Sequence, residues 1–154
     1  MGAKVFVFTH SPHKVEDAKR LGADQVIISS NSGAFQPYVK TFDFILDTVS
    51  APHDPTPYLE TLKRDGTLVF VGLPDKKHPA PEISELIFKR RAMAGSLIGG
   101  LTETQEMLDF CGQHNVTADI ELINADEINL AYDRVINSDV KYRFVIDAST
   151  YPVE

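Results

Sequence analysis

Short apolar runs recur along the first two thirds of this chain, and they constrain its fold more than any other feature. The first run reads VFVF at residues 5–8, and similar runs follow at intervals. Continuous apolar runs of this length are typical of strands buried on both faces, as in a parallel sheet covered by helices. The predicted strands are residues 5–8, 25–28, 42–47, 67–71 and 92–98.

Helical signals separate these strands. Ser11 and Pro12 suit an N-cap and a first helical position, and Gly22 lies where a C-terminal glycine ends a helix. Further helices are predicted at residues 34–40, 56–63, 82–90 and from Thr102, with a turn at Asp65. Strands that alternate with helices predict an open α/β fold, with a parallel sheet and helices on both faces.

The last third of the chain predicts a separate strand–helix–strand segment. The helix from Thr102 has a Thr102–Gln105 capping box and an apolar stripe expected to be buried, in which Cys111 is a core residue. A strand at residues 118–123, a helix capped by Asn124 and a strand at residues 142–147 follow it. We expect one domain over residues 1–114 and a second segment over residues 115–154.

Composition excludes several classes of function. The chain has 154 residues, 43% of them hydrophobic, and a net charge of −7, which argues against general nucleic-acid binding. Its apolar runs are too short to cross a membrane. Met1 leads directly into the first strand, so we expect no secretory leader and a cytoplasmic location. The single cysteine excludes an internal disulfide and a multi-cysteine zinc site.

Four polar residues follow the first strand and form a candidate anion site. Thr9, His10, Ser11 and Lys14 bring hydroxyls and positive charge to one turn, and a lysine there is mildly unfavourable without a nearby anion. The alternative is a solvated surface lysine without a ligand.

Several longer motifs resemble one enzyme family over nearly the whole chain. They are DFILDTV (residues 43–49), LKRDGTLVFVGLP (62–74), KRRAMAGSLIGG (89–100), ETQEMLDFC (103–111) and VKYRFVID (140–147). Together they resemble the cofactor domain of medium-chain zinc-dependent alcohol dehydrogenases, in the NADP-using branch similar to cinnamyl alcohol dehydrogenase. The resemblance implies an oxidoreductase with an incomplete Rossmann-type sheet.

The resemblance also implies a role for particular residues in NADP binding. Thr9, His10, Ser11 and Lys14 would hold the 2′-phosphate, although His10 departs from the hydroxyl residue usual there. The other cofactor contacts implied are Thr48, Val49, Val71, Gly72, Pro74, Ser96, Ile98 and Arg143. No catalytic or metal-binding residue is implied for this chain.

Two family features have no counterpart in the sequence. The glycine-rich turn G-x-G-x-x-G is missing, and so are the zinc ligands, which lie in the family's catalytic domain. We therefore expect the C-terminal part of a longer enzyme, in which zinc would belong to the absent domain. Without the family's first strand, the strands at residues 5–8 and 42–47 lose a shared neighbour. We expect closure of that gap, pairing with another chain, or low stability.

Three functions follow as alternatives. The chain is the cofactor portion of an NADP-dependent alcohol dehydrogenase that transfers hydride between an alcohol or aldehyde and the cofactor, and is inactive alone. Otherwise it is a non-catalytic NADP-binding module, or a dimerisation module that pairs with full-length relatives. The family dimerises through the strand matching Arg91 to Leu101, so a homodimer is expected. The histidines His53, His78 and His114 are predicted to be surface residues, and Asp43, Asp47 and Asp65 to be strand-end and turn residues.

Overall fold

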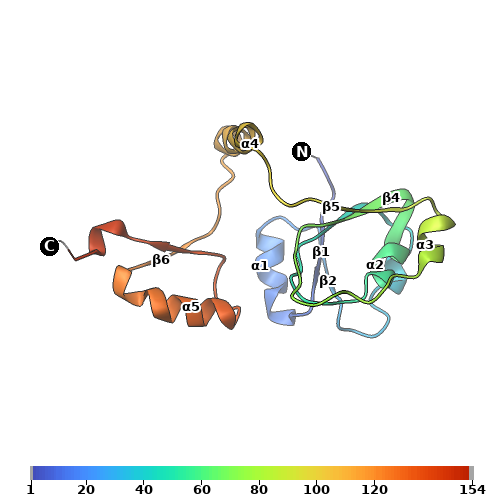
Figure 1. The fold of residues 1–154 in the computed structure, drawn as a ribbon, viewed down its shortest axis with the longest axis horizontal. Coiled ribbons are helices and arrows are strands. Elements are labelled where there is room, and N and C mark those ends of the chain that lie inside the picture. Colours follow the sequence, from blue (N-terminus) through green and yellow to red (C-terminus); the bar gives the residue numbers. More distant parts are fainter. Residues whose placement is uncertain (1, 153–154) are drawn as a thin grey trace. The chain divides into compact units, whose positions relative to one another are not determined.

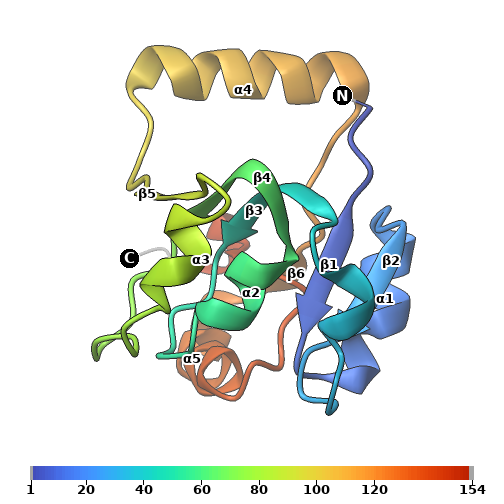
Figure 2. The same cartoon turned by 90° about the vertical axis from the view of Figure 1, so that its right-hand side faces the viewer.

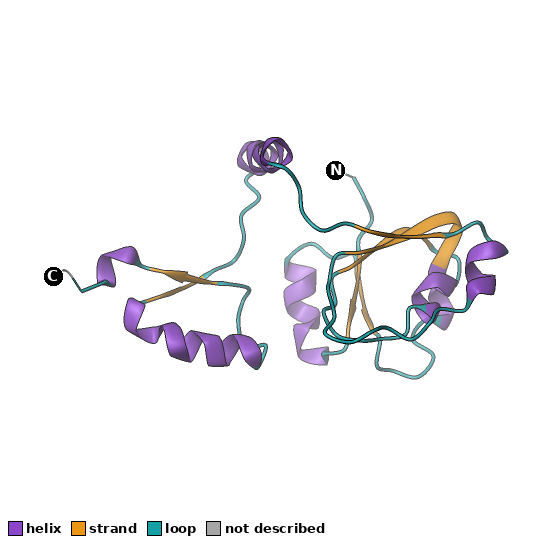
Figure 3. Cartoon of the chain, viewed as in Figure 1, coloured by secondary structure: helices purple, strands orange, loops and turns teal. Residues whose placement is uncertain are grey.

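The computed structural model describes residues 2–152, which form two compact units, Met1–Leu97 and Ile98–Glu154 (Figure 1). Parallel strands and helices alternate along the chain, which confirms the predicted α/β fold (Figure 3). The strands are β1 (Phe6–Thr9), β2 (Gln25–Ile28), β3 (Phe42–Asp47), β4 (Leu62–Phe70), β5 (Ala92–Gly95), β6 (Glu121–Ile123) and β7 (Phe144–Ile146). The helices are α1 (Val15–Arg20), α2 (Thr56–Thr61), α3 (Ile83–Ile87), α4 (Leu101–His114) and α5 (Ile128–Ile136), with short 3₁₀ turns at Pro12–Lys14, Gln36–Tyr38, Ala125–Glu127 and Ala148–Thr150.

The first unit contains two separate parallel sheets. Strand β1 pairs with β2, and β3, β4 and β5 form a second sheet in that order, as Figure 2 shows. Within the described part of the chain, β1 and β3 are not paired with each other. The backbone therefore does not close the gap that the missing first strand was expected to leave.

Aromatic side chains join the two sheets where backbone pairing is missing. Phe6 and Phe8 on β1 lie 5.1 and 5.7 Å, between ring centroids, from Phe42 on β3. Tyr38 stacks on Phe42 from the loop between β2 and β3. Edge-to-face packing of this kind stabilises a contact beyond the area it buries, so side chains hold the unit together across the gap.

The core of the first unit lies under helices α2 and α3. Leu59 of α2 and Leu62 and Leu68 of β4 are fully buried, and Leu86 of α3 packs against them. The side chain of Arg91 is only 1% exposed and donates to the carbonyl oxygens of Leu62 and Glu60 and to the carboxylate of Glu85. These bonds fix the entry to β5, because they satisfy a guanidinium that would be costly to bury alone.

Several predicted boundaries differ from the structure. Helix α2 ends at Thr61, and β4 begins at Leu62 and continues through Asp65, where a turn was predicted. Asp65 has a φ of 63°, and the register with β3 shifts between Phe42 and Phe44, so the turn signal marks an irregularity inside a strand. A turn-forming sequence such as Asp65-Gly66 identifies a local backbone conformation. It does not show whether the strand continues past that point by pairing with its neighbour.

The second unit begins with helix α4, whose cap and packing both differ from expectation. The Glu103 carboxylate accepts a hydrogen bond from the amide of Gly100, so Gly100 is the cap, two residues before the predicted Thr102, and the helix begins at Leu101. Its apolar stripe is exposed: Met107 by 50%, Leu108 by 53% and Phe110 by 38%. Helical periodicity correctly predicted an apolar face there but could not determine what covers it.

The rest of the second unit matches the predicted strand–helix–strand segment. Strand β6 pairs in parallel with β7, and Ala131 of α5 is buried. The predicted Asn124–Glu127 cap is present, since the Glu127 carboxylate accepts from the Asn124 amide at 2.8 Å. The structure divides the chain into compact units at residue 98. The predicted division at residue 115 concerns the functional parts of a full-length enzyme instead, and it stays a prediction. No helix among residues 2–152 is long and apolar enough to cross a membrane.

Candidate functional site

The turn after β1 holds the four residues of the predicted 2′-phosphate site. The Thr9 hydroxyl accepts from the Ser11 amide at 3.1 Å, and the Lys14 amide donates to the Ser11 carbonyl at 3.0 Å. These bonds curl the backbone into a tight turn. Thr9 and Ser11 are half-buried, whereas His10 and Lys14 are exposed. Lys14 forms no ion pair with any residue that the structure describes, so its charge is available to a ligand.

The turns after β3 and β4 lie against each other. The backbone oxygen of Asp47 accepts from the amides of both Val71, at 2.9 Å, and Gly72, at 3.2 Å. The carboxylate of Asp47 accepts from the Val49 amide at 2.9 Å. The structure thus brings together four predicted site residues, Thr48, Val49, Val71 and Gly72, at the carboxyl ends of two neighbouring strands. Ligands of open α/β sheets bind at such strand ends.

Gly72 permits a close approach of the backbone of Thr48 and Val49. A Cβ atom at this position would lie 2.6 Å from the carbonyl carbon of Val49 and 2.8 Å from that of Thr48. Only glycine lets the two turns meet. Contact within the protein therefore accounts for the glycine at this position, and the cofactor contact implied for Gly72 stays a prediction.

The remaining predicted residues are spread over both units. Pro74 is half-buried in the loop after β4, and the Ser96 amide donates to the carbonyl of Phe70, which places Ser96 beside the end of β4. Ile98 and Arg143 belong to the second unit and are exposed. Their contact with a cofactor stays a prediction.

Sequence reasoning missed a cluster beside these turns. Asp47 is 8% exposed and His53 is 15% exposed, measured on their side chains, and His53 Nε2 lies 2.7 Å from Asp47 Oδ2. The ring of His78 lies 4.7 Å from that of His53. The expectation that both histidines lie on the surface is wrong for His53, and His78 is half-buried. The sequence feature that could have revealed this cluster is that His53 and His78 lie in the loops that follow two adjacent strands, β3 and β4.

Tyr58 of α2 links this cluster to the end of β1. Its ring contacts Phe8 at 5.3 Å and His53 at 5.6 Å, between centroids. Burial raises the pKa of Tyr58, a hydrogen bond with Ser29 opposes that rise, and the charge of Asp47 adds to it. The phenol therefore stays neutral, and it serves as a rigid spacer between the two sheets.

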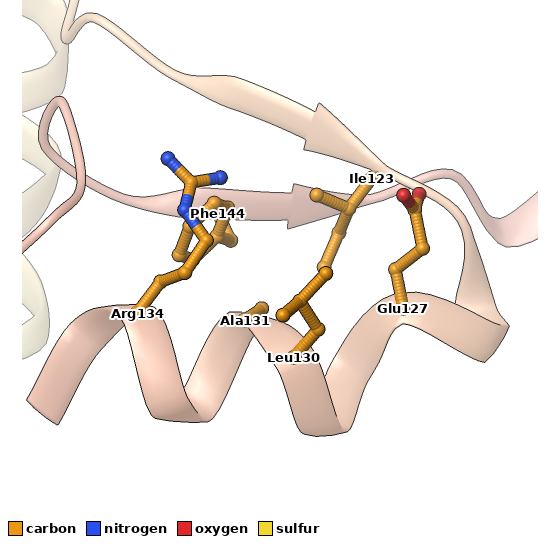
Figure 4. A pocket seen from close by; sticks show the side chains of 6 residues that line it. All are labelled: Ile123, Glu127, Leu130, Ala131, Arg134 and Phe144. Atoms are coloured by element: carbon orange, nitrogen blue, oxygen red, sulfur yellow. The ribbon is translucent and has the colours of Figure 1, made fainter.

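The second unit contains a shallow pocket between α5 and strands β6 and β7 (Figure 4). Arg134 reaches into it, but its guanidinium already donates to Glu121 at 2.7 Å and to Asp139 at 2.9 Å. Hydrogen bonds to Asp139 and then Glu121 raise the pKa of Arg134. Its charge is thus neutralised internally, and the pocket is a poor anion site. The lining residues are Ile123, Glu127, Leu130, Ala131, Arg134 and Phe144.

A zinc site does not fit the residues that the structure describes. They contain no group of three or more histidine, cysteine, aspartate or glutamate side chains placed to hold a metal ion. Zinc requires at least three such protein ligands in catalytic sites. We therefore assign no metal-dependent step to the described residues.

Parallel strands whose carboxyl ends lie side by side, joined by helices, define a Rossmann-like α/β domain. The model of the zinc-binding dehydrogenase family matches residues 1–113, and the chain belongs to that family. It is 57% identical over 150 residues to aldehyde reductase YahK of Escherichia coli, covering 97% of this chain and 43% of that protein.

Solved structures agree with this assignment. A cinnamyl alcohol dehydrogenase from Sorghum bicolor superposes with a TM-score of 0.92 and 40% identity, over 99% of this chain and 43% of that one. The cinnamyl alcohol dehydrogenase from Helicobacter pylori complexed with NADP(H) gives a TM-score of 0.83 and 36% identity, over 97% and 42%. The chain thus spans less than half the length of the relatives that it matches.

Proposed function

We propose that this chain is the NADP-binding portion of an NADP-dependent alcohol or aldehyde oxidoreductase. The observation that carries the proposal is the turn after β1, where Thr9, Ser11 and the unpaired cation Lys14 replace the acid that NAD users place there. A carboxylate would repel a 2′-phosphate, whereas hydroxyls and an ammonium group donate to it. A relative solved with NADP(H) supports this choice of cofactor.

In this proposal the chain binds and orients the cofactor and performs no chemistry alone. The adenosine 2′-phosphate is held after β1, and the turns after β3 and β4, with Ser96, Ile98 and Arg143, hold the rest of the nucleotide. NADP supplies the hydride that passes to or from the substrate carbon. Turnover of an alcohol or aldehyde would need the part of the relatives that this chain does not span, including a zinc site.

The binding test compares NADP with NAD by titration calorimetry. We expect Lys14→Ala to weaken NADP binding about tenfold, the effect of losing one hydrogen bond to a charged group, and to leave NAD binding unchanged. Lys19→Ala is the matched control, because Lys19 lies in α1, directly after the turn that ends at Lys14, and is paired with Glu16. No NADP binding at millimolar concentration, or equal losses for both nucleotides, would refute the proposal.

A second candidate function is pairing with another copy of this chain or with a full-length relative. Strand β5 is an edge of its sheet, and Leu97, two residues after its end, is 83% exposed. Edge strands with exposed apolar residues are templates for pairing. Sedimentation should then show a dimer that Gly95→Pro converts to a monomer. The Ser96 amide points to β4, so the neighbouring Gly95 amide points to the open edge, and proline there removes the donor needed for pairing. A monomer at all concentrations would exclude pairing between copies of this chain, and a mixture with a full-length relative that shows no complex would exclude the second form of this function.

A further inference from the structure

The loops that follow β3 and β4 are fastened to each other by histidines. His53 lies in the first loop and His78 in the second, 25 residues further along the chain. His78 Nδ1 lies 3.2 Å from the amide nitrogen of His53 and 3.0 Å from its carbonyl oxygen, so the ring bonds the His53 backbone in either tautomer, and the two rings meet edge to face. The His78 ring is also 5.4 Å from that of Phe70, at the end of β4. The contact therefore spans two separate loops and is anchored on a strand.

The same contact extends to the turn that the proposed function assigns to the cofactor. His53 Nε2 bonds Oδ2 of Asp47, and Oδ1 of Asp47 accepts the amide of Val49. The Asp47 carboxylate thus connects His53 to the backbone amide of Val49. A change at His53 should reach the Val49 amide through two hydrogen bonds.

The His53 ring has an oxygen acceptor beside each of its two nitrogens. Its Nδ1 lies 3.0 Å from the carbonyl oxygen of Ala51, and its Nε2 faces the Asp47 carboxylate. Both partners only accept hydrogen bonds, so both bonds form together when the ring carries both protons. The Asp47 carboxylate, whose side chain is 8% exposed, is thus held by His53 at one oxygen and by the Val49 amide at the other.

We propose that Asp47, His53 and His78 form a clasp that sets the position of the cofactor-facing turns. Here the clasp means these three side chains. His53 and His78 act as positioning residues: they contact no cofactor atom themselves, but hold Val49 and Gly72 at the carboxyl ends of β3 and β4. This inference rests on the proposed function, because it specifies how the same site is held ready for the nicotinamide half of NADP.

The test uses the whole chain and two readouts. The first, without ligand, is hydrogen exchange of the Val49 amide measured by NMR. His53→Ala and His78→Ala should each accelerate it about fivefold, the effect of one hydrogen bond lost. His78→Asn keeps a hydrogen-bonding group that can accept from the His53 amide or donate to its carbonyl, and it should stay within twofold of the wild type. His114→Ala, a histidine outside the clasp, should have no effect.

The second readout separates the two halves of the cofactor. The clasp variants should weaken NADP about fivefold and leave the affinity for adenosine 2′,5′-bisphosphate unchanged, because that fragment ends before the nicotinamide. Unchanged Val49 exchange in His53→Ala, or equal losses for both ligands, would overturn the clasp. If exchange responds as expected but the wild type binds neither ligand, the clasp geometry holds, and the proposed function fails together with the cofactor role of the clasp.

Discussion

Gly72 and Val49 lie in direct backbone contact, although 22 other residues separate them in the sequence. The absent Cβ of Gly72 leaves the space that the carbonyl group of Val49 occupies. Both residues also hydrogen-bond Asp47, Gly72 through its amide to the backbone oxygen and Val49 through its amide to the carboxylate. The contact makes the turns after β3 and β4 one structural element.

Gly72→Ala should destabilise the first unit by about 2 kcal/mol, because overpacking against fixed backbone forces the two turns apart. Thermal unfolding followed by circular dichroism measures this. Gly95→Ala is the matched control: its new Cβ would meet only the Phe70 oxygen, at an ordinary 3.8 Å, and should change stability little. Equal effects of the two substitutions would show that the turns can separate freely.

The gap between β1 and β3 predicts a pattern of hydrogen exchange. In a strand, the N–H and C=O of one residue point to the same edge, and successive residues alternate. The Val5 and Thr9 oxygens accept from the residues flanking β2, and the Asp47 oxygen accepts from the Val71 amide. The amides that face the gap are therefore those of Phe6, Phe8, Phe44 and Leu46.

These four amides should exchange roughly a hundredfold faster than those of Val7 and Ile45, whose groups face paired strands. NMR-detected exchange on the dilute chain measures the ratio. Equal protection at both edges would mean that another strand fills the gap. Its source would then be tested by sedimentation, since a second copy would make the protection depend on concentration.

The second unit should lose stability in acid because of Glu121. Hydrogen bonds from the Lys141 amide and then from Arg134 hold the pKa of Glu121 below its ordinary value of 4.5. A carboxyl with a lowered folded-state pKa contributes stability that is fully present above its unfolded value, and that is lost as pH falls through the folded value. Asp147, whose pKa is lowered by the Ser149 hydroxyl and amide, adds to the same loss.

E121Q should reduce this acid sensitivity and lower stability at neutral pH. The Phe144 ring reports it, since the Arg134 guanidinium lies 4.8 Å from the ring centroid and would move. The measurement is the ring proton chemical shift of Phe144 between pH 3 and pH 7. Asp126→Asn, an exposed residue of the same unit, is the control. An unchanged titration of the Phe144 shift in E121Q would contradict the assignment.

Local patterns were enough to predict most of the elements. The runs at residues 25–28 and 42–47 became β2 and β3 without a change of boundary, because their aromatic and aliphatic residues favour strands. The expected burial on both faces is wrong for β3, where Phe44 is 58% and Leu46 is 54% exposed. The Asn124 cap and the C-terminal position of Gly22, with a φ of 102°, were also correct. Each depends on a few neighbouring residues, so sequence alone carries the information.

What covers an apolar face, and which distant side chains meet, was decided only by the tertiary structure. The stripe on α4 has the right period but is exposed, and His53 and His78 look like loop residues until the loops are placed side by side. The sequence by itself determined an α/β chain of the zinc-binding dehydrogenase family, with a hydroxyl-rich turn after β1. The tertiary structure decided that Asp47, His53, Gly72 and His78 join the next two turns, because hydrogen bonds and close contacts between distant residues leave no periodic trace in the sequence.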